Sequence, residues 1–500
     1  MTCVIDIESI LLTLFSTYVN YLKYLAAIAV AILLMPALTT SCTREDVMLT
    51  DGFELTFSCD TVAFDTVFTA MGSTTRQVRV YNTGSQPVQL SSVTLQGGRS
   101  SRFRLNVDGD TSMIVRNLEI GAHDSIFIFI QANINPNASN APFLVEDAIL
   151  FNSPKGSQRL PLTAYGRNAV YHKPEHTIHD ADGNAYPYSV IDCDAWDHTR
   201  PHVMMGYAVV DSGCTLHLVA GDELYFANDG YLWVYKDGTL DARGTAEQPV
   251  LFTSLRHDGW YDKLPGQWGY IWLSDGSKDN VLDWAVVENG YVGLFVNSTH
   301  YPTLTISNTR VENHSLAGIL GQGSSIVGDN LLVDNCGTAT IVLQYGGRYQ
   351  FSNSTFADYY AYESRTTPSV ILSNAYGSGA DLQLNGLQQA TFRNCIIYGN
   401  YNGNDASGEI LFDYHNGAAY NVVFDHCLLK STLAAPFATS CITNQDPQFT
   451  DATAQDYHLK ATSPAIAQGD PTFITLPNDL DNHPRAIPPT IGAFEVGSED

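Results

Sequence analysis

Asp283-Trp-Ala-Val-Val-Glu-Asn289 is the first of four related phrases that decide the fold of this chain. The other three are Asn308-Thr-Arg-Val-Glu-Asn313, Asn330-Leu-Leu-Val-Asp-Asn335 and Asn353-Ser-Thr-Phe-Ala-Asp358. Their first residues step by 25 (283 to 308), 22 (308 to 330) and 23 (330 to 353), a period that is typical of solenoids. Apolar and polar residues alternate through the stretch Val281–Phe356, which indicates strands and not helices.

A repeat of this length, built of short strands, Gly and Asn, cannot bury one of its faces alone and has to stack on its neighbours. It therefore predicts a parallel β-helix. The strand-helix signature of leucine-rich repeats is absent, and a propeller blade would need roughly 40 residues. We expect the recurring Asn residues to form ladders of stacked amides at turns, where Asn tolerates left-handed backbone geometry. Cys395 and Cys427 occupy the same place in two copies, so we expect them to lie close together, as stacked thiols or as a disulfide.

The composition restricts the partners. The 500 residues carry 52 acidic and 25 basic side chains, a formal charge of -27. Such a surface repels polyanions, which excludes nucleic acid as a partner and disfavours polyuronates unless a cation bridges them. The nine cysteines include no CxxC pair, so we expect no structural zinc and mainly free, buried thiols. Asp180-Ala-Asp-Gly-Asn184 looks like the start of a calcium loop but lacks the downstream Glu, so we expect a plain turn; we expect no cofactor, and Ca²⁺ has no support.

The N-terminal segment, residues 1–42, has the pattern of a signal sequence. The apolar run Tyr24–Leu38 is short for a membrane span, and the small residues before Cys42 resemble a bacterial lipobox. This resemblance implies lipidation at Cys42 and a membrane anchor, and Arg44-Glu-Asp46 resembles the signal that sends such lipoproteins to the cell surface. The alternatives are an uncleaved helix or a buried thiol.

Four further regions follow the signal segment. Residues 51–168 alternate strands with turn residues at the spacing of a β-sandwich, and Val80-Tyr-Asn-Thr-Gly84 followed by Pro87-Val-Gln-Leu90 resembles immunoglobulin-like modules of bacterial surface proteins. That resemblance implies a spacer or adhesive module. We expect a linker leading into the solenoid at 169–210, the β-helix at 211–445 and a C-terminal cap at 446–500.

Several motifs resemble one family. They are Gly238-Thr-Leu-Asp-Ala-Arg-Gly244, Gln248-Pro-Val-Leu-Phe-Thr253, Gln267-Trp-Gly-Tyr-Ile271, Asp446-Pro-Gln-Phe449, Asp481-Asn-His-Pro-Arg485 and Ile491-Gly-Ala-Phe-Glu495. The chain is similar in these motifs to surface lipoproteins of Bacteroidetes that have a right-handed parallel β-helix, the pectate-lyase-like fold. The resemblance implies an all-β chain in which an immunoglobulin-like sandwich precedes a β-helix with a C-terminal cap. It also implies that the protein lies in the outer membrane and is exposed at the cell surface. It implies little about chemistry.

Two strands predict a binding surface. In Tyr231–Tyr235 alternation buries Leu232 and Val234, and in Tyr270–Leu273 it buries Ile271 and Leu273. The outward and loop aromatics are then Tyr231, Trp233, Tyr235, Trp260, Tyr261, Trp268, Tyr270 and Trp272. Aromatic rings with polar edges suit sugar rings, and an exposed aromatic patch usually marks a partner. The alternative is that the first domain or the loop itself covers these rings.

Catalysis has weaker support in the sequence. Hydrolases need paired carboxylates, and β-helix lyases need calcium-binding Asp residues with a basic residue. Acidic residues recur at turn positions, where we expect solvated side chains: Asp283, Glu288, Glu312, Asp329, Asp334 and Asp358. We therefore expect an envelope-anchored module that binds a polysaccharide or host glycan, and not an enzyme. The alternatives are a polysaccharide lyase or glycoside hydrolase with a groove beside the 360–388 insertion, and a structural spacer.

Overall fold

The structure is a computed structural model that describes residues 54–496 apart from 139, 258, 404–407 and 433. Cys42 and the signal segment lie outside the described residues. The chain divides into two compact units: one contains Thr75–Gln131, Asp147–Leu162 and the residues up to Val62, and the other contains Ala63–Thr74, Ala132–Glu146 and the chain from Thr163 onward. No helix in the described part of the chain is long and apolar enough to cross a membrane.

Residues 54–167 form two sheets that are rich in antiparallel pairs, as the alternating pattern predicts. The smaller sheet has the order β1 (Leu55–Phe57), β3 (Arg76–Asn82), β7 (Ser125–Ala132), β5 (Phe103–Val107). The larger sheet has the order β2 (Val62–Phe68), β9 (Gly156–Arg167), β8 (Phe143–Ser153), β4 (Val88–Leu95), β6 (Ile114–Ile120). The two sheets pack on each other, for example through the rings of Phe57 and Phe151, whose centroids are 5.1 Å apart. An immunoglobulin-like topology stays a prediction.

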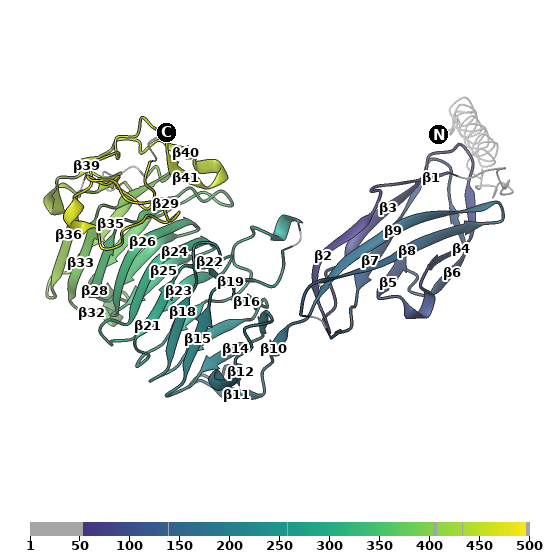
Figure 1. Ribbon diagram of the computed structural model, residues 1–500, viewed down its shortest axis with the longest axis horizontal. Helices are drawn as coiled ribbons and strands as arrows, with labels where there is room; N and C mark the ends of the chain where they lie inside the picture. Colours follow the sequence, from purple (N-terminus) through teal and green to yellow (C-terminus); the bar gives the residue numbers. More distant parts are fainter. Residues whose placement is uncertain (1–53, 139, 258, 404–407, 433, 497–500) are drawn as a thin grey trace, which may run out of the picture. The chain divides into compact units, whose positions relative to one another are not determined.

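From Val170 onward the strands of successive coils pair in parallel, and the antiparallel pairs are three hairpins, β11–β12, β31–β32 and β40–β41 (Figure 1). Two rows of strands belong to one 18-stranded sheet and share β24 (Leu304–His314) and β26 (Ser325–Cys336). Row 1 also contains β15 (Thr215–Val219), β18 (Thr239–Arg243), β21 (Asn280–Asp283), β28 (Gly347–Ser352), β33 (Leu387–Arg393), β36 (Tyr420–Asp425) and β38 (Ala438–Thr439). Row 2 also contains β10 (Val170–His172), β13 (His202–Met204), β16 (Glu223–Phe226), β19 (Val250–Ser254), β22 (Ala285–Glu288), β29 (Thr355–Asp358), β34 (Ile396–Gly399), β37 (Leu428–Leu429) and β39 (Ile442–Thr443).

A separate ten-stranded sheet forms the third row. Its strands are β11 (His176–His179), β12 (Ala185–Val190), β14 (Tyr207–Val210), β17 (Tyr231–Val234), β20 (Ile271–Leu273), β23 (Val292–Val296), β25 (Ala317–Gln322), β27 (Ala339–Gln344), β30 (Val370–Ser373) and β35 (Ile410–Asp413). The helical segments of the described residues are single 3-10 turns: η1 (Gly98–Ser100), η2 (Cys193–Ala195), η3 (Gly259–Tyr261), η4 (Gly379–Asp381), η5 (Ala435–Phe437), η6 (Ala452–Ala454) and η7 (Pro471–Phe473). The prediction of an all-β chain whose repeats stack into parallel sheets is therefore confirmed.

The four phrases form successive strands of row 2, and their alternation sets which side chains face the interior. Val287, Val311, Val333 and Phe356 pair in register and are completely buried. Asn308, Asn330, Asn353 and Asn394 take positive φ angles of 47°, 53°, 47° and 49°. The amide of Asn330 donates to Asn308 Oδ1 (3.0 Å), and that of Asn394 donates to Asn353 Oδ1 (3.0 Å). The predicted amide ladder is thus present in pairs, and between the two pairs the amide of Asn353 donates to Asp329 Oδ1 (2.9 Å) in place of Asn330.

The cysteines follow the prediction in part. Cys395 and Cys427 are buried, unbridged and stacked, since the Cys395 backbone N–H lies 3.4 Å from Cys427 Sγ. Cys193 and Cys214, by contrast, form a disulfide. The expectation of free thiols is wrong for this pair. The turn before β15 brings Cys214 next to Cys193 in η2, and the sequence around either cysteine does not indicate this contact between two coils.

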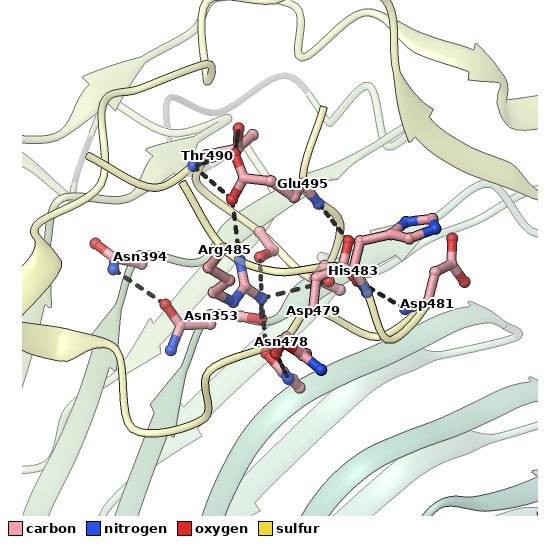
Figure 2. Close-up of polar contacts among 12 residues, drawn as sticks. Asn353, Asn394, Asn478, Asp479, Asp481, His483, Arg485, Thr490 and Glu495 are labelled. Atoms are coloured by element: carbon pink, nitrogen blue, oxygen red, sulfur yellow. Dashed lines mark hydrogen bonds and ion pairs between the residues drawn. The ribbon is translucent and has the colours of Figure 1, made fainter. Parts of the chain in front are cut away.

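The C-terminal cap binds the Asn ladder (Figure 2). Arg485, only 8% exposed, donates to Asn330 Oδ1 (2.6 Å) and to the carbonyl of Gly492 (3.1 Å). Asn394 donates to the carbonyl of Asp470 and accepts from its N–H. The hairpin of β40 (Phe449–Asp451) and β41 (Asp456–Leu459) packs on the outer side of row 2, where Tyr457 is buried.

Candidate functional site

An outward-facing set of rings covers neighbouring strands of the ten-stranded sheet, and we call it the aromatic face. Leu232, Val234, Ile271 and Leu273 are completely buried, which confirms the predicted inward positions. The register then aligns the outward rings, since Tyr207 pairs with Tyr231, Trp233 with Trp272 and Trp272 with Phe295. The aromatic face consists of Tyr207, Tyr231, Trp233, Tyr235, Tyr270, Trp272 and Phe295.

Neighbouring rings of the aromatic face stack on one another from strand to strand. The centroids of Trp233 and Trp272 are 4.9 Å apart with planes at 12°, and those of Trp272 and Phe295 are 6.1 Å apart at 15°. All three of these rings are half-buried. Tyr235 stands edge-on to Trp233 and is 42% exposed.

Polar groups edge the aromatic face. Trp272 Nε1 donates to Asn297 Oδ1 (3.0 Å), whereas Trp233 Nε1 is buried without a hydrogen-bond partner among the described residues. Burial raises the pKa of Tyr207 and of Tyr270, so both phenols stay neutral near pH 7. The aromatic face therefore combines uncharged phenol hydroxyls with apolar rings, which is the chemistry that recognises sugar hydroxyls and C–H groups.

Three predicted residues do not belong to the aromatic face. Trp268 is 1% exposed and stacks on Phe226 in the solenoid core, with its Nε1 donating to the carbonyl of Glu288 (2.8 Å). The expectation that Trp268 is a loop residue beside the outward rings is wrong, because it lies in register with Gly290 one coil on and alternation turns it inward. Trp260 (72% exposed) and Tyr261 lie in the loop between β19 and β20, where Arg256 covers the Tyr261 ring.

A row of carboxylates follows the outer side of row 2, one residue after the buried Val287, Val311 and Val333. Glu288 pairs with Glu312, and Glu312 pairs with Asp334. Glu288 and Glu312 are half-buried, while Asp334 and Asp358 are completely buried and Asp329 is 9% exposed. The expectation of solvated turn residues is wrong for these positions, because stacked coils and the cap cover them. Asp283 is half-buried and accepts hydrogen bonds from Ser307 and Asn308.

Burial also raises the pKa values of the carboxyl groups in this row. Burial raises the pKa of Glu288. Burial also raises the pKa of Glu312, and the charge of the neighbouring Glu288 raises it further. The pKa of Asp334 lies well above its usual range because of burial and then of Glu312 and Asp358. Burial raises the pKa of Asp358 to about 7, although Arg365 opposes the shift. Neighbouring acids with raised pKa values are a recurrent property of active sites, and they also occur in structural networks.

The insertion after Asp358 is more regular than the sequence indicates. Part of it is β30, a strand of the ten-stranded sheet, and part is a hairpin of β31 (Ala375–Tyr376) and β32 (Gln383–Leu384). Arg365 pins its start through Glu409 Oε1 (3.0 Å) and Oε2 (2.9 Å) and through Asp358 (3.2 Å). These ion-paired side chains are almost completely buried, so they hold the loop in place.

Two observations concern the binding of metal ions. Asp180 accepts hydrogen bonds from Asn184 and Tyr186, and the Asn184 side chain is the main reason that its pKa is lowered to about 2. The segment is thus a turn whose acid is already satisfied. In the described part of the chain, no group of three or more His, Cys, Asp or Glu side chains is placed to hold a metal ion.

No protein-family model and no curated protein sequence matches the chain. Among solved structures, the E. coli chaperone DraB is 15% identical over 23% of this chain and 55% of its own, with a TM-score of 0.17. A family 123 glycoside hydrolase from Clostridium perfringens is 14% identical over 24% of each chain, with a TM-score of 0.18. The catalytic domain of a GH87 alpha-1,3-glucanase, in complex with tetrasaccharides, is 10% identical over 74% of this chain and 90% of its own, with a TM-score of 0.18. TM-scores this low carry no conclusion about fold or function.

Proposed function

We propose that this chain is a glycan-binding module and that the aromatic face is its binding surface. The observation that carries the proposal is the register that places Trp233, Trp272 and Phe295 in one overlapping row on successive strands. Each ring fills an outward position of a strand whose inward positions are packed, so rigid elements hold the rings in place. Rings held in this way bind without the entropic cost of ordering a loop.

The charge of the chain indicates the kind of glycan. A formal charge of -27 disfavours uronate or sulfated polymers, and the aromatic face presents neutral phenol and indole groups. The ligand class is therefore a neutral oligosaccharide or polysaccharide. A chain of several sugar units fits a row that extends over neighbouring coils.

The setting of the module rests on the resemblance of the sequence to surface lipoproteins of Bacteroidetes. Within this proposal, a lipid on Cys42 anchors the chain in the outer membrane, and the immunoglobulin-like sheets separate the anchor from a right-handed, pectate-lyase-like β-helix. The parallel sheets and the cap on the Asn ladder support only the β-helix in this arrangement.

A glycan array with purified wild-type protein, Trp233→Ala and Trp272→Ala tests the proposal. Wild type binds neutral glycans, and both variants lose at least tenfold in affinity, which corresponds to about 1.4 kcal/mol. Trp260→Ala is the matched control, since it removes an exposed indole that lies outside the aromatic face. Equal binding by all four proteins, or no binding by wild type, would show that the aromatic face has another role, such as that of a structural spacer.

A further inference from the structure

We propose that a cavity between the edge strands of the first unit binds an extended peptide that carries acidic and apolar side chains. The cavity has a volume of about 730 Å³, which is within the range of roughly 300–1,000 Å³ that ligand sites have. Every residue that lines it belongs to Thr75–Gln131, so the cavity lies entirely within the first unit. The proposal does not depend on glycan binding by the aromatic face, which lies in the second unit.

The cavity lies where both sheets end in an unpaired edge. β5 is the last strand of the four-stranded sheet, and β6 is the last strand of the five-stranded sheet. Four of the five residues of β5 line the cavity, together with Met113, which directly precedes β6. A strand at the edge of a sheet offers backbone N–H and C=O groups with which an extended peptide can pair.

The hydrogen bonds around β5 identify the backbone groups that are open to a peptide. Because the N–H of Asp108 donates to the carbonyl of Phe127 on β7 (2.9 Å), alternation turns the backbone groups of Leu105 away from β7 and toward the free edge. Val107 faces the same way and exchanges its hydrogen bonds with Asp110 in the adjoining turn. Leu105 has no such partner on this side among the described residues, so its N–H and C=O can pair with an added strand.

The exposed apolar side chains of the first unit gather at this cavity. Met113 is 56% exposed, Ile114 44% and Phe129 39%, and no other large apolar side chain in the described part of the first unit is exposed. Met113 and Phe129 line the cavity together with the half-buried Leu95 and Leu105. Apolar side chains that are exposed together usually mark a binding site, and every second side chain of an extended peptide points to the same face.

Two guanidinium groups determine the charge of the ligand. Arg99 and Arg104 line the cavity, and no acidic side chain lines it. Arg104 Nη1 donates to the carbonyls of Ser101 (2.9 Å) and Phe103 (2.8 Å), which holds this guanidinium group in place. Neither arginine forms an ion pair with a carboxylate of the described residues. A carboxylate of the ligand therefore meets a cation that is already positioned.

The charge balance of the first unit favours the same class of ligand. Residues 54–62, 75–131 and 147–162 carry eight basic and seven acidic side chains, although the formal charge of the whole chain is -27. Asp110, in the turn after β5, already accepts a hydrogen bond from the N–H of Ser112 (2.8 Å). An acidic peptide is therefore not repelled by the first unit, and a basic peptide finds no carboxylate in the cavity to pair with.

An extended peptide fits these observations better than a small amphiphile does. It alone uses the backbone edge of β5, the apolar side chains and the guanidinium groups together. The five residues of β5 extend over roughly 17 Å, at about 3.3 Å for each residue. A peptide of about eight residues is therefore long enough to pair with the whole strand.

Calorimetric titration of synthetic eight-residue peptides into the purified protein tests the proposal. The probe peptide alternates valine with glutamate, and the two matched peptides alternate valine with lysine and serine with glutamate. We expect the probe peptide to bind and each matched peptide to bind at least tenfold more weakly, because one lacks the charge and the other lacks the apolar contacts. Equal binding of the glutamate and lysine peptides, or no binding of the probe peptide, would overturn the proposal.

Two substitutions separate the charge of the cavity from its strand edge. Arg104→Glu lowers the affinity for the probe peptide at least tenfold, whereas Arg102→Glu, the matched control, leaves it unchanged, because Arg102 is exposed nearby but does not line the cavity. Leu105→Pro removes the outward N–H and no hydrogen bond to β7, and proline is tolerated at such edge positions. We expect this variant to bind about fivefold more weakly, the effect of one backbone hydrogen bond. Unchanged binding by Leu105→Pro or by Arg104→Glu would contradict the proposed mode of binding.

A measurement on wild type keeps the proposal testable if a variant does not fold. Hydrogen–deuterium exchange of β5 slows when the probe peptide is bound, since the N–H of Leu105 gains an acceptor; unchanged exchange in the complex would overturn strand addition. Displacement of the probe peptide by dodecanoate, or by formation of a dimer of the chain, would show that a small amphiphile or a second copy is the true occupant. Glycan binding fails separately, since Arg104→Glu should bind the glycan array as wild type does and Trp272→Ala should bind the probe peptide as wild type does.

Discussion

Replacement of Asn394 by Ala tests whether the amide ladder holds the cap on the solenoid. The Asn394 side chain is completely buried and makes three hydrogen bonds: to Asn353 Oδ1 (3.0 Å), to the carbonyl of Asp470 (3.0 Å) and from the N–H of Asp470 (2.9 Å). At about 1 kcal/mol net for each bond, their loss costs about 3 kcal/mol. The φ angle of 49° adds roughly 1–2 kcal/mol of strain for Ala, because only Gly, Asn and Asp adopt this geometry readily. We therefore expect the free energy of unfolding of the solenoid to fall by about 4 kcal/mol.

Urea unfolding followed by tryptophan fluorescence measures this loss in the solenoid alone. All six tryptophans lie between residues 196 and 284, outside the first two sheets. Asn394→Gly is the matched variant, since it loses the same hydrogen bonds without the strain, so we expect it to be destabilised by about 3 kcal/mol. A loss below 1 kcal/mol for Asn394→Ala would refute the reasoning, because it would mean that the ladder carries no net stability.

Three further predictions concern the solenoid. Trp268→Ala leaves a core cavity and lowers the free energy of unfolding by about 3–5 kcal/mol, whereas Trp272→Ala, on the half-buried aromatic face, lowers it by less than half as much; equal losses in urea unfolding would contradict the inward position of Trp268. Replacement of both Cys193 and Cys214 by serine removes a disulfide between residues 21 apart and lowers the free energy of unfolding by about 3 kcal/mol. An unchanged unfolding midpoint in this variant would show that the disulfide adds no stability. Burial raises the pKa of Asp358 to about 7 in the folded protein, so the folded form holds a proton that the unfolded form releases above about pH 4. The stability that this proton contributes is therefore present at low pH and is lost as the pH rises toward 7. The free energy of unfolding of Asp358→Asn should depend less on pH between 5 and 7.5 than that of wild type, and parallel pH profiles of the two proteins would refute the assignment.

The alternation of residues was enough to predict the solenoid and the orientation of two strands. Leu232 and Val234 point inward because a strand has a period of two, a local property that needs no knowledge of the partners. The same holds for the Asn ladder, since a period near 23 residues places equivalent side chains directly above one another, as in the pairs Asn308–Asn330 and Asn313–Asn335.

The burial of side chains by distant segments could not be read from these patterns. Trp268 is in the core because a single bridge to Gly290 extends the alternation into what looks like a loop. Asp334 is buried because the cap, more than 100 residues later in the chain, places Tyr457 over it. The Cys193–Cys214 disulfide likewise depends on how two coils meet. The only signal of the carboxylate row in the sequence was that Glu288, Glu312 and Asp334 share one place in the repeat, and that place alone did not say whether water reaches them.

The measurement that tests glycan binding by the aromatic face most directly is calorimetric titration of one neutral oligosaccharide into wild type, Trp272→Ala and Trp260→Ala. Wild type and Trp260→Ala should bind with the same dissociation constant, and Trp272→Ala should bind at least tenfold more weakly, a loss of about 1.4 kcal/mol. If Trp272→Ala binds as tightly as wild type, or if only Trp260→Ala loses affinity, the aromatic face is not the glycan-binding surface.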